Sequence, residues 1–522
     1  MTTITASSTV GIGLSSYGSP SYVNPVVINP GVTISNYYAY GIGVDGGGDV
    51  WTIRSAGTIA GNITSGQGVD LKYGGSVTNQ SGARISGLTG VYGGYELALS
   101  VVNAGSITGN TTTSAGNGIY LQAGGSVTNQ SGGMITGFDG IYGGANYTLM
   151  VVNAGSIAGN TAAGEGIYLG HGGSVFNQSS ATINGSIGIG GKGGPMTVVN
   201  AGTVSGGISF APGYVNLLTV NPGAVFNGSV DGGNTIGAGS VSTLELASAA
   251  SDGTVAGLGT KFTNFGSIVF DAGANWSIAG NISGLAGTIS DFAIGDTIEL
   301  TDVTATGSSF SGGILKLDEA IGSTTLDLPG TFTTASEFHV VPIAGGTEVT
   351  VAPPCFCSGT RLLAGSGEVA VEAVAPGDLL VTVSGQARSV QWIGRRHINF
   401  LRHPRPQDVQ PVRVRAGAFG ASIPHRDLLL SPDHSVFIDG VLIPIRYLIN
   451  GRTIVQEPVE RVTYYHVELD QHDVILAEGL PCESYLDTGN RSAFANGGDE
   501  AMLHPGKLVE THSTVGDLHM LR

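Results

Sequence analysis

The chain has very little cysteine and very little charge. Its only cysteines are Cys355, Cys357 and Cys482, so the first 354 residues contain none. Three cysteines cannot form a disulfide framework, and a long cysteine-free segment is compatible with any redox compartment. Only 11% of the 522 residues are charged and 41% are hydrophobic. With that hydrophobic content and no Gly-X-Y period, the 87 glycines indicate neither disorder nor collagen.

Long apolar runs are missing as well. No stretch of about 18 apolar residues exists, so we expect no membrane-spanning helix. The first eight residues lack the basic region and the apolar core of a conventional signal peptide. Localisation therefore has to be inferred from architecture, and the repeats described below favour a secreted or cell-surface protein.

The few charges divide the chain into two parts. Residues 1–352 carry 6 Lys/Arg and 19 Asp/Glu, whereas residues 353–522 carry 15 and 19, together with nine of the eleven histidines. The net charge of −17 argues against nucleic acid as a partner. The length predicts two or three domains, and the change of composition places a boundary near residue 353.

The first part repeats itself. The heptapeptide GSVTNQS at residues 75–81 returns at 125–131 and, as GSVFNQS, at 173–179. A second series, VVNAGSI at 101–107, returns at 151–157 and, with variation, at 198–204. The asparagines of the two series follow one another at intervals of 24, 26, 24, 24 and 23 residues. A period of this length is typical of a solenoid, in which each repeat buries its apolar face by stacking on its neighbours.

The residues within each repeat favour strands. Val, Ile, Thr and Tyr alternate with small polar residues, and Gly-Gly or Asn-Ala-Gly supplies the corners. We therefore predict an all-β chain whose residues 1–290 form a right-handed parallel β-helix of about 20–25 residues per coil. Residues 291–352 are predicted to form a β-rich cap or connector, with strands at 294–300 and 348–351. The repeated asparagines either stack into a side-chain ladder or serve only as turn residues, and the sequence leaves both open.

The second part contains six motifs in a fixed order. They lie at residues 355–362 (CFCSGTRL), 371–378, 390–395, 428–434 (LLLSPDH), 442–451 and 465–479. In this order they resemble the Hint (hedgehog/intein) domain family, especially its bacterial group. The resemblance predicts a compact all-β Hint domain at residues 353–490, followed by a tail at 491–522. The repeat arm, more loosely, resembles the Gly/Asn-rich passenger regions of autotransporters and adhesins.

The family resemblance implies autocatalytic processing at Pro354–Cys355. The Cys355 thiolate would attack the carbonyl of Pro354 in an N-to-S acyl shift, because a thiolate is a good nucleophile and a thioester a better acyl donor than an amide. By its match to the family's Thr/Ser-x-x-His element, His434 would act on the scissile amide, with Ser431 hydrogen-bonding nearby.

Other residues remain alternatives. Cys357 is the rival nucleophile, although the family places the reactive cysteine directly before Phe356. His472 either assists catalysis or is structural. A Cys-x-Cys metal site lacks a second ligand pair, so we expect neither metal nor cofactor. Cys482 is expected to be buried and inert.

Splicing is not expected. The segment at residues 480–485 (LPCESY) lacks the His-Asn pair, followed by Cys, Ser or Thr, with which splicing inteins close. The thioester would pass instead to an acyl acceptor that the sequence does not identify, such as water, a small amine or another molecule.

Two other classes of function stay open. The protein could be a structural or adhesive β-helix protein with an inactive Hint-like cap, whose arm makes cell-surface or extracellular-matrix contacts. It could also be a polysaccharide-active β-helix enzyme, which would need paired carboxylates. Asp70, Glu96, Asp139 and Glu165 are scattered singly through the repeats and are expected to be solvated turn residues.

Overall fold

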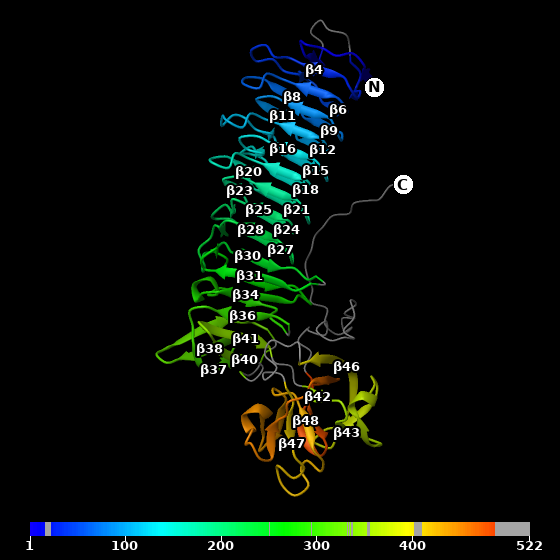
Figure 1. Ribbon diagram of the computed structural model, residues 1–522, viewed down its shortest axis with the longest axis vertical. Coiled ribbons are helices and arrows are strands. Elements are labelled where there is room, and N and C mark those ends of the chain that lie inside the picture. Colours follow the sequence, from blue (N-terminus) through cyan, green and yellow to red (C-terminus); the bar gives the residue numbers. More distant parts are fainter. Residues whose placement is uncertain are drawn as a thin grey trace. The chain divides into compact units, whose positions relative to one another are not determined.

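The protein folds as two β-rich units (Figure 1). The computed structural model describes residues 1–15, 22–249, 251–293, 295–330, 332, 335, 338–351, 355–400 and 410–485. The two units are Met1–Ala352 and Pro353–Arg522, and each is described by itself. In the described ranges the helices are single turns of 3₁₀ helix at η1 (Ile282–Gly284), η3 (Val371–Ala373) and η5 (Ile445–Leu448). The prediction of an all-β chain is confirmed.

The first unit is a parallel β-solenoid of about 12 turns, as the repeats predict. Each regular coil adds one strand to each of three parallel sheets. One coil consists of β9 (Gly75–Asn79), β10 (Arg84–Ser86) and β11 (Thr89–Gly93), and the next of β12 (Leu99–Asn103), β13 (Ser106–Thr108) and β14 (Ile119–Leu121). The sequence repeat is the structural repeat, because residues at equal repeat positions lie in register.

The asparagines form a ladder inside the solenoid. The side-chain amide of Asn79 donates to Oδ1 of Asn103, which donates to the next asparagine, and the series continues to Asn200 with every N···O distance between 2.8 and 2.9 Å. All members are buried. Of the two roles that the sequence left open for these asparagines, the structure therefore shows the side-chain ladder. Its hydrogen bonds satisfy polar groups that would be costly to bury alone.

Glycine pairs make the sharp corners between coils. Gly124 and Gly125 have φ of 70° and 130°, a region that L-residues rarely adopt. A Cβ on Gly125 would also collide with the carbonyl oxygen of Leu99 in the coil before it. The Gly-Gly steps of the repeat are thus required by both backbone conformation and close approach of the coils.

The solenoid ends in antiparallel hairpins. The last parallel addition to one sheet is β36 (Thr297–Leu300), on which β41 (Gly346–Val351) and β40 (Phe338–Ile343) form an antiparallel pair. A meander of β37 (Ala305–Ser311), β38 (Ile314–Glu319) and β39 (Ser323–Asp327) extends another sheet. Strands lie at both of the positions predicted here, as β36 and β41, and Ile294 lies outside the described residues.

The carboxylates of the repeats differ from the expectation. Asp70 and Asp139 are buried, so the prediction of solvated turn residues is wrong for both, and only Glu96 is exposed as expected. The Glu165 amide N–H donates to Oδ1 of Asp139 at 2.7 Å, and burial together with Asp139 raises the pKa of Glu165 to about 7. Asp70 and Asp139 lie on or beside strands, where the coils stacked on either side shield a side chain from water.

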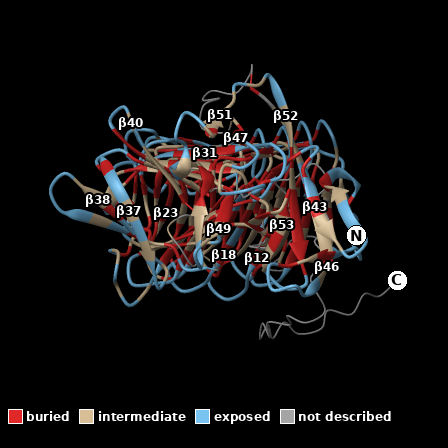
Figure 2. Ribbon diagram, turned by 90° about the horizontal axis from the view of Figure 1, so that it is seen from below, coloured by how far each residue is buried: buried red, intermediate tan, exposed pale blue. Residues whose placement is uncertain are grey.

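The second unit is a 13-stranded antiparallel sheet with a main core and a smaller separate cluster of Cys355, Cys357 and Tyr464. Its core is made of aliphatic residues and Phe356, and Figure 2 shows the buried positions lying along the strands while the turns are exposed. The strands are β42 (Phe356–Cys357), β43 (Arg361–Ala364), β44 (Gly367–Ala370), β45 (Leu379–Val381), β46 (Ala387–Asn399), β47 (Val412–Val414), β48 (Leu428–Leu430), β49 (Ser435–Ile438), β50 (Val441–Pro444), β51 (Ile454–Gln456), β52 (Arg461–Leu469), β53 (Val474–Ala477) and β54 (Leu480–Glu483).

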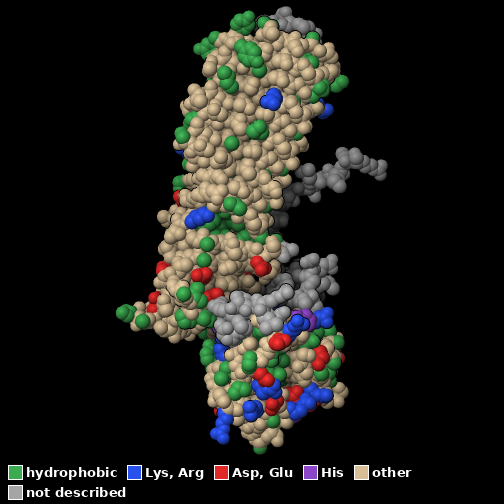
Figure 3. Space-filling model, viewed as in Figure 1, with side chains coloured by type: hydrophobic (Ala, Val, Ile, Leu, Met, Phe, Trp, Pro, Cys, Tyr) green, Lys and Arg blue, Asp and Glu red, His purple; other side chains and the backbone are tan. Residues whose placement is uncertain are grey.

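The two units differ in the number of charged side chains on their surfaces, as they do in composition. Figure 3 shows charged side chains gathered on the second unit, while the visible face of the solenoid carries few. No helix among the described residues is long and apolar enough to cross a membrane.

Candidate functional site

The predicted nucleophile, Cys355, directly precedes a short strand in the middle of the second unit's sheet. β42 is paired on one side with β48, where Phe356 lies opposite Leu430, and on the other with β52, where Phe356 lies opposite Tyr465. The Phe356 side chain belongs to the main core, whereas Cys355 and Cys357 face the opposite side of the strand. Cys355 is therefore immobilised by its neighbours on both sides, and only 2% of its surface is exposed.

Ser431 holds the backbone of Cys355 at two points. The Cys355 amide N–H donates to Oγ of Ser431 at 2.8 Å, and the Ser431 amide N–H donates to the Cys355 carbonyl at 2.9 Å. The Cys355 nitrogen is the leaving nitrogen of the predicted scissile bond. Ser431 thus lies beside that nitrogen.

A tight turn brings His434 to the same site. The His434 amide N–H donates to the Ser431 carbonyl at 3.1 Å, which closes a β-turn with Pro432 in its second position. The turn is tied to the next segment, because the Ile445 amide donates to the His434 carbonyl at 2.9 Å and Asp433 forms an ion pair with Arg446. The imidazole ring of His434 packs on the Phe356 ring, with centroids 4.2 Å apart.

His434 is buried and neutral. Only 1% of its surface is exposed, and burial lowers its pKa to about 4, although the nearby backbone of Cys355 and Glu483 opposes that shift. Within the described part of the chain, neither ring nitrogen makes a hydrogen bond of normal geometry. A neutral imidazole beside the backbone of Cys355 can donate its N–H to a nitrogen that is losing its amide character.

A second histidine, which the sequence analysis did not assign, contacts the thiol directly. Nε2 of His466, on β52, lies 2.6 Å from Sγ of Cys355, and the imidazole stands edge-on to the ring of Tyr485 at 5.1 Å between centroids. The antiparallel register of β42 and β52 places position 466 opposite position 355. The Cys355 thiol therefore has a base in hydrogen-bond reach.

Burial keeps this pair in its neutral form. Burial raises the pKa of the Cys355 thiol, and the positive charge of Arg396 opposes that rise. Burial also lowers the pKa of His466 well below its ordinary value. Transfer of the thiol proton to Nε2 of His466 turns the neutral pair into a thiolate and an imidazolium without exchange with solvent. The charge of Arg396 lowers the pKa of both groups, so it favours the thiolate and disfavours the imidazolium.

The other predicted residues lie in varied places. Cys357 is buried opposite Tyr464 on the same face as Cys355, and burial raises the pKa of its thiol. His472 lies in the exposed turn between β52 and β53. Cys482 is fully buried, as expected. Pro354, the acyl side of the predicted scissile bond, and the tail at 491–522 lie outside the described residues.

Comparison with known proteins identifies the second unit. Residues 354–489 match the family model of the Hint domain. The chain is similar to a crystal structure of the MchDnaB-1 intein, with 17% identity over 25% of this chain and 99% of that one, at a TM-score of 0.19. It is also similar to the solution structure of a bacterial intein-like domain from Clostridium thermocellum, with 15% identity over 25% and 98% and a TM-score of 0.19. No curated protein matches the chain.

The chain therefore carries a Hint domain C-terminal to a β-solenoid, as the sequence motifs predicted. A domain of this class has a general capacity for autoprocessing.

Proposed function

We propose that this protein cleaves itself at Pro354–Cys355 by an N-to-S acyl shift and passes the acyl group of its N-terminal part to an external nucleophile. The observation that carries the proposal is the contact between Cys355 Sγ and His466 Nε2 at 2.6 Å. It joins a thiol near the start of the domain to a buried base, which a purely structural strand does not need.

In the first step the Cys355 thiol gives its proton to His466 and its sulfur attacks the carbonyl carbon of Pro354. The new S–C bond makes a tetrahedral intermediate whose negative charge lies on the former carbonyl oxygen. The charge of Arg396 favours the thiolate in this step, because it lowers the pKa of the attacking thiol, although it lowers the pKa of His466 as well. Cys357 lies opposite Tyr464 instead of a histidine, which supports Cys355 as the nucleophile.

In the second step the C–N bond breaks and the Cys355 nitrogen leaves as an amine. That nitrogen needs a proton, since an amide anion is too basic to leave. Ser431 already holds its N–H, and His434 lies at the backbone of Cys355, so both support proton delivery to the nitrogen. The proton that the nitrogen gains is the one that His466 took from the thiol, passed on through Ser431 or His434. His466 is then neutral again, and a thiol and an amide have become a thioester and an amine with no net change in protons.

The thioester then reacts with water, a small amine or another molecule, which releases residues 1–354 and restores the Cys355 thiol. The absence of a His-Asn pair in residues 480–485 supports cleavage or transfer without splicing. A place outside the cell belongs to the same proposal and is supported by the style of the repeats, which suits contacts with a cell surface or matrix.

The alternative is a structural or adhesive protein with an inactive Hint domain, and added thiol separates the two. Purified chain incubated with dithiothreitol is expected to split into fragments of about 354 and 168 residues, because the thiol intercepts the thioester. The measurement is intact mass over time. A single species of unchanged mass after long incubation would favour the inactive domain.

His466 is expected to set the pH dependence of cleavage. The reactive ion pair has the same number of protons as the neutral pair, so the rate should be flat from the lowered pKa of His466 up to the raised pKa of Cys355, and should fall as His466 is protonated in acid. In His466→Gln the thiolate must form by loss of a proton to solvent. Its fraction, and the rate, should then rise about tenfold per pH unit below the thiol pKa.

The matched control is His397→Gln. His397 lies on β46, and its Nδ1 bonds to Oγ1 of Thr463 at 2.8 Å, away from the thiol. The control should keep the flat profile. A flat profile in the His466 variant as well would mean that His466 is not the base.

A further inference from the structure

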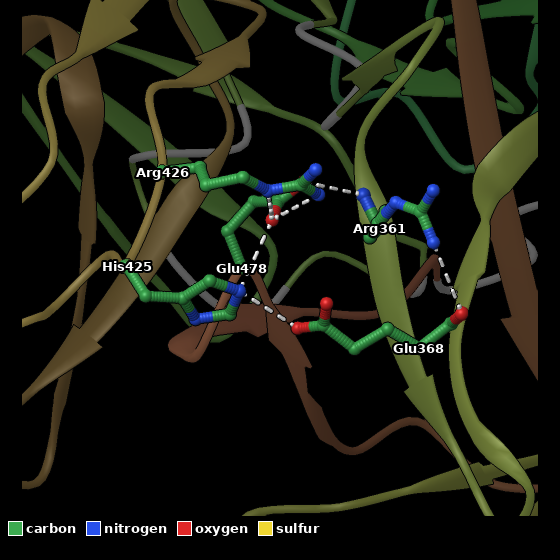
Figure 4. Close-up of polar contacts among 5 residues, drawn as sticks. All are labelled: Arg361, Glu368, His425, Arg426 and Glu478. Atoms are coloured by element: carbon green, nitrogen blue, oxygen red, sulfur yellow. Dashed lines mark hydrogen bonds and ion pairs between the residues drawn. The ribbon is translucent and has the colours of Figure 1, made fainter.

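A second cluster of polar side chains lies on the Hint domain and is not used by the chemistry above. Nε2 of His425 lies 2.9 Å from Oε1 of Glu368 and 3.3 Å from Oε2 of Glu478. Figure 4 shows the imidazole and the two carboxylates pointing toward one another from three separate segments. These segments are β44, the chain just before β48, and the turn between β53 and β54.

We propose that Glu368, His425 and Glu478 form a binding site for a divalent transition-metal ion of the zinc class. Their three ligand atoms all lie within 4.8 Å of one another, so one ion can contact all three after small side-chain movements. One imidazole nitrogen with two carboxylate oxygens is a ligand set that suits Zn²⁺, whereas Ca²⁺ and Mg²⁺ prefer oxygen ligands alone.

Glu478 is held in place as a metal-binding carboxylate is. Its Oε1 accepts the Arg361 amide N–H at 2.8 Å, and the Arg426 guanidinium donates to both carboxylate oxygens. Such outer partners fix the direction of a ligating carboxylate. The Glu478 side chain is 3% exposed, so this orientation is set by the fold.

The other two ligands leave room for an ion to enter. The side chains of Glu368 and His425 are 31% and 36% exposed. The Arg361 guanidinium donates to the Glu368 backbone carbonyl and leaves the Glu368 carboxylate to His425. Gly479 gives the imidazole its space, because a Cβ there would lie 3.0 Å from Nδ1 of His425.

Two carboxylates lie against the imidazole, and the Arg426 guanidinium binds that of Glu478. Metal binding releases the proton that Nε2 of His425 otherwise shares with the carboxylates. The bound ion would join three segments that are far apart in sequence and so stabilise the Hint domain.

The test is titration of the full chain with Zn²⁺ by calorimetry and with Co²⁺ by absorption. His425→Ala and Glu368→Gln should each weaken one equivalent of Zn²⁺ by at least about 100-fold, since loss of an outer partner alone costs 10–100-fold. The Co²⁺ spectrum of that equivalent should lack a thiolate charge-transfer band. Zn²⁺ should raise the melting temperature of the parent chain and not that of the His425 variant.

His397→Ala is the control, and it should bind as the parent does. Unchanged stoichiometry and affinity in both ligand variants would overturn the site and assign the binding to histidines elsewhere. A thiolate band would overturn it also, because it would place the ion at Cys355 or Cys357. Neither result bears on self-cleavage, which is measured without added metal.

Discussion

Replacing Cys355 with alanine is expected to abolish self-cleavage completely, because the variant has no atom that can accept the acyl group. Replacing Cys357 with alanine is expected to leave the cleavage rate within a few-fold of the parent. The two cysteines lie two residues apart, face the same side of β42 and are both buried. Only Cys355 contacts a histidine through its sulfur and has its backbone held by Ser431.

The comparison is a close one because both variants remove the same atom from neighbouring buried positions. Cys355→Ser keeps nearly the volume of the thiol and controls for the small cavity that alanine leaves. Serine should slow the reaction severely, since a hydroxyl is a far weaker nucleophile than a thiol of this environment. The same cut in Cys355→Ala, at any rate, would move the nucleophile elsewhere and contradict the proposed site.

Replacing His434 with alanine is expected to slow thioester formation by roughly a hundred- to ten-thousand-fold. The tetrahedral intermediate returns to the starting peptide unless its nitrogen gains a proton, so loss of the donor affects the forward step. Because burial lowers the pKa of His434 to about 4, the residue is neutral at pH 7 and acts as a hydrogen-bond donor through its N–H, not as a standing imidazolium. Its effect should therefore persist across the neutral pH range.

His472→Ala is the matched control for that variant. His472 lies in an exposed turn, so its loss should change the rate little, and both variants should keep the far-ultraviolet spectrum of the parent. The rate is measured by intact mass after addition of thiol. An unchanged rate in His434→Ala would show that the match to the family's His motif does not carry its role to this chain.

The solenoid could be predicted from sequence because its contacts repeat with the sequence. Each coil meets a copy of itself about 24 residues away, so Asn103 meets Asn129 and Val101 meets Val127. The asparagine ladder stayed undecided because asparagine is equally common in turns. Its burial, and the 2.8 Å bond between neighbouring amides, depend on how coils stack, which a single repeat does not show.

The site was only partly predictable, because its contacts join residues far apart in the sequence and do not repeat along it. Cys355, Ser431 and His434 lie in motifs of the Hint family, so their pairing followed from the resemblance. His466 was part of a matched motif, yet nothing near it in the chain marks it, since its partner thiol is 111 residues away. A usable signal was its place in β52, where it lies on the same face as Tyr464 and Glu468, both of which are buried.

The Glu368–His425–Glu478 cluster had no sequence signal at all. Its members come from a hairpin, a loop and a turn, and metal motifs read from sequence depend on short spacings that these residues do not have. The expectation of no metal was drawn from the spacing of Cys355 and Cys357 alone. The convergence arises only when β43 pairs with β44 and with β53.

The central claim is that a thioester forms between Pro354 and the sulfur of Cys355, and capture with hydroxylamine tests it most directly. Hydroxylamine attacks thioesters much faster than amides, so the fragment of residues 1–354 should appear with a C-terminal hydroxamate at Pro354. Its yield should follow the hydroxylamine concentration and vanish in Cys355→Ala. A fragment that ends as a free acid at every hydroxylamine concentration, or that ends at another residue, would contradict the account.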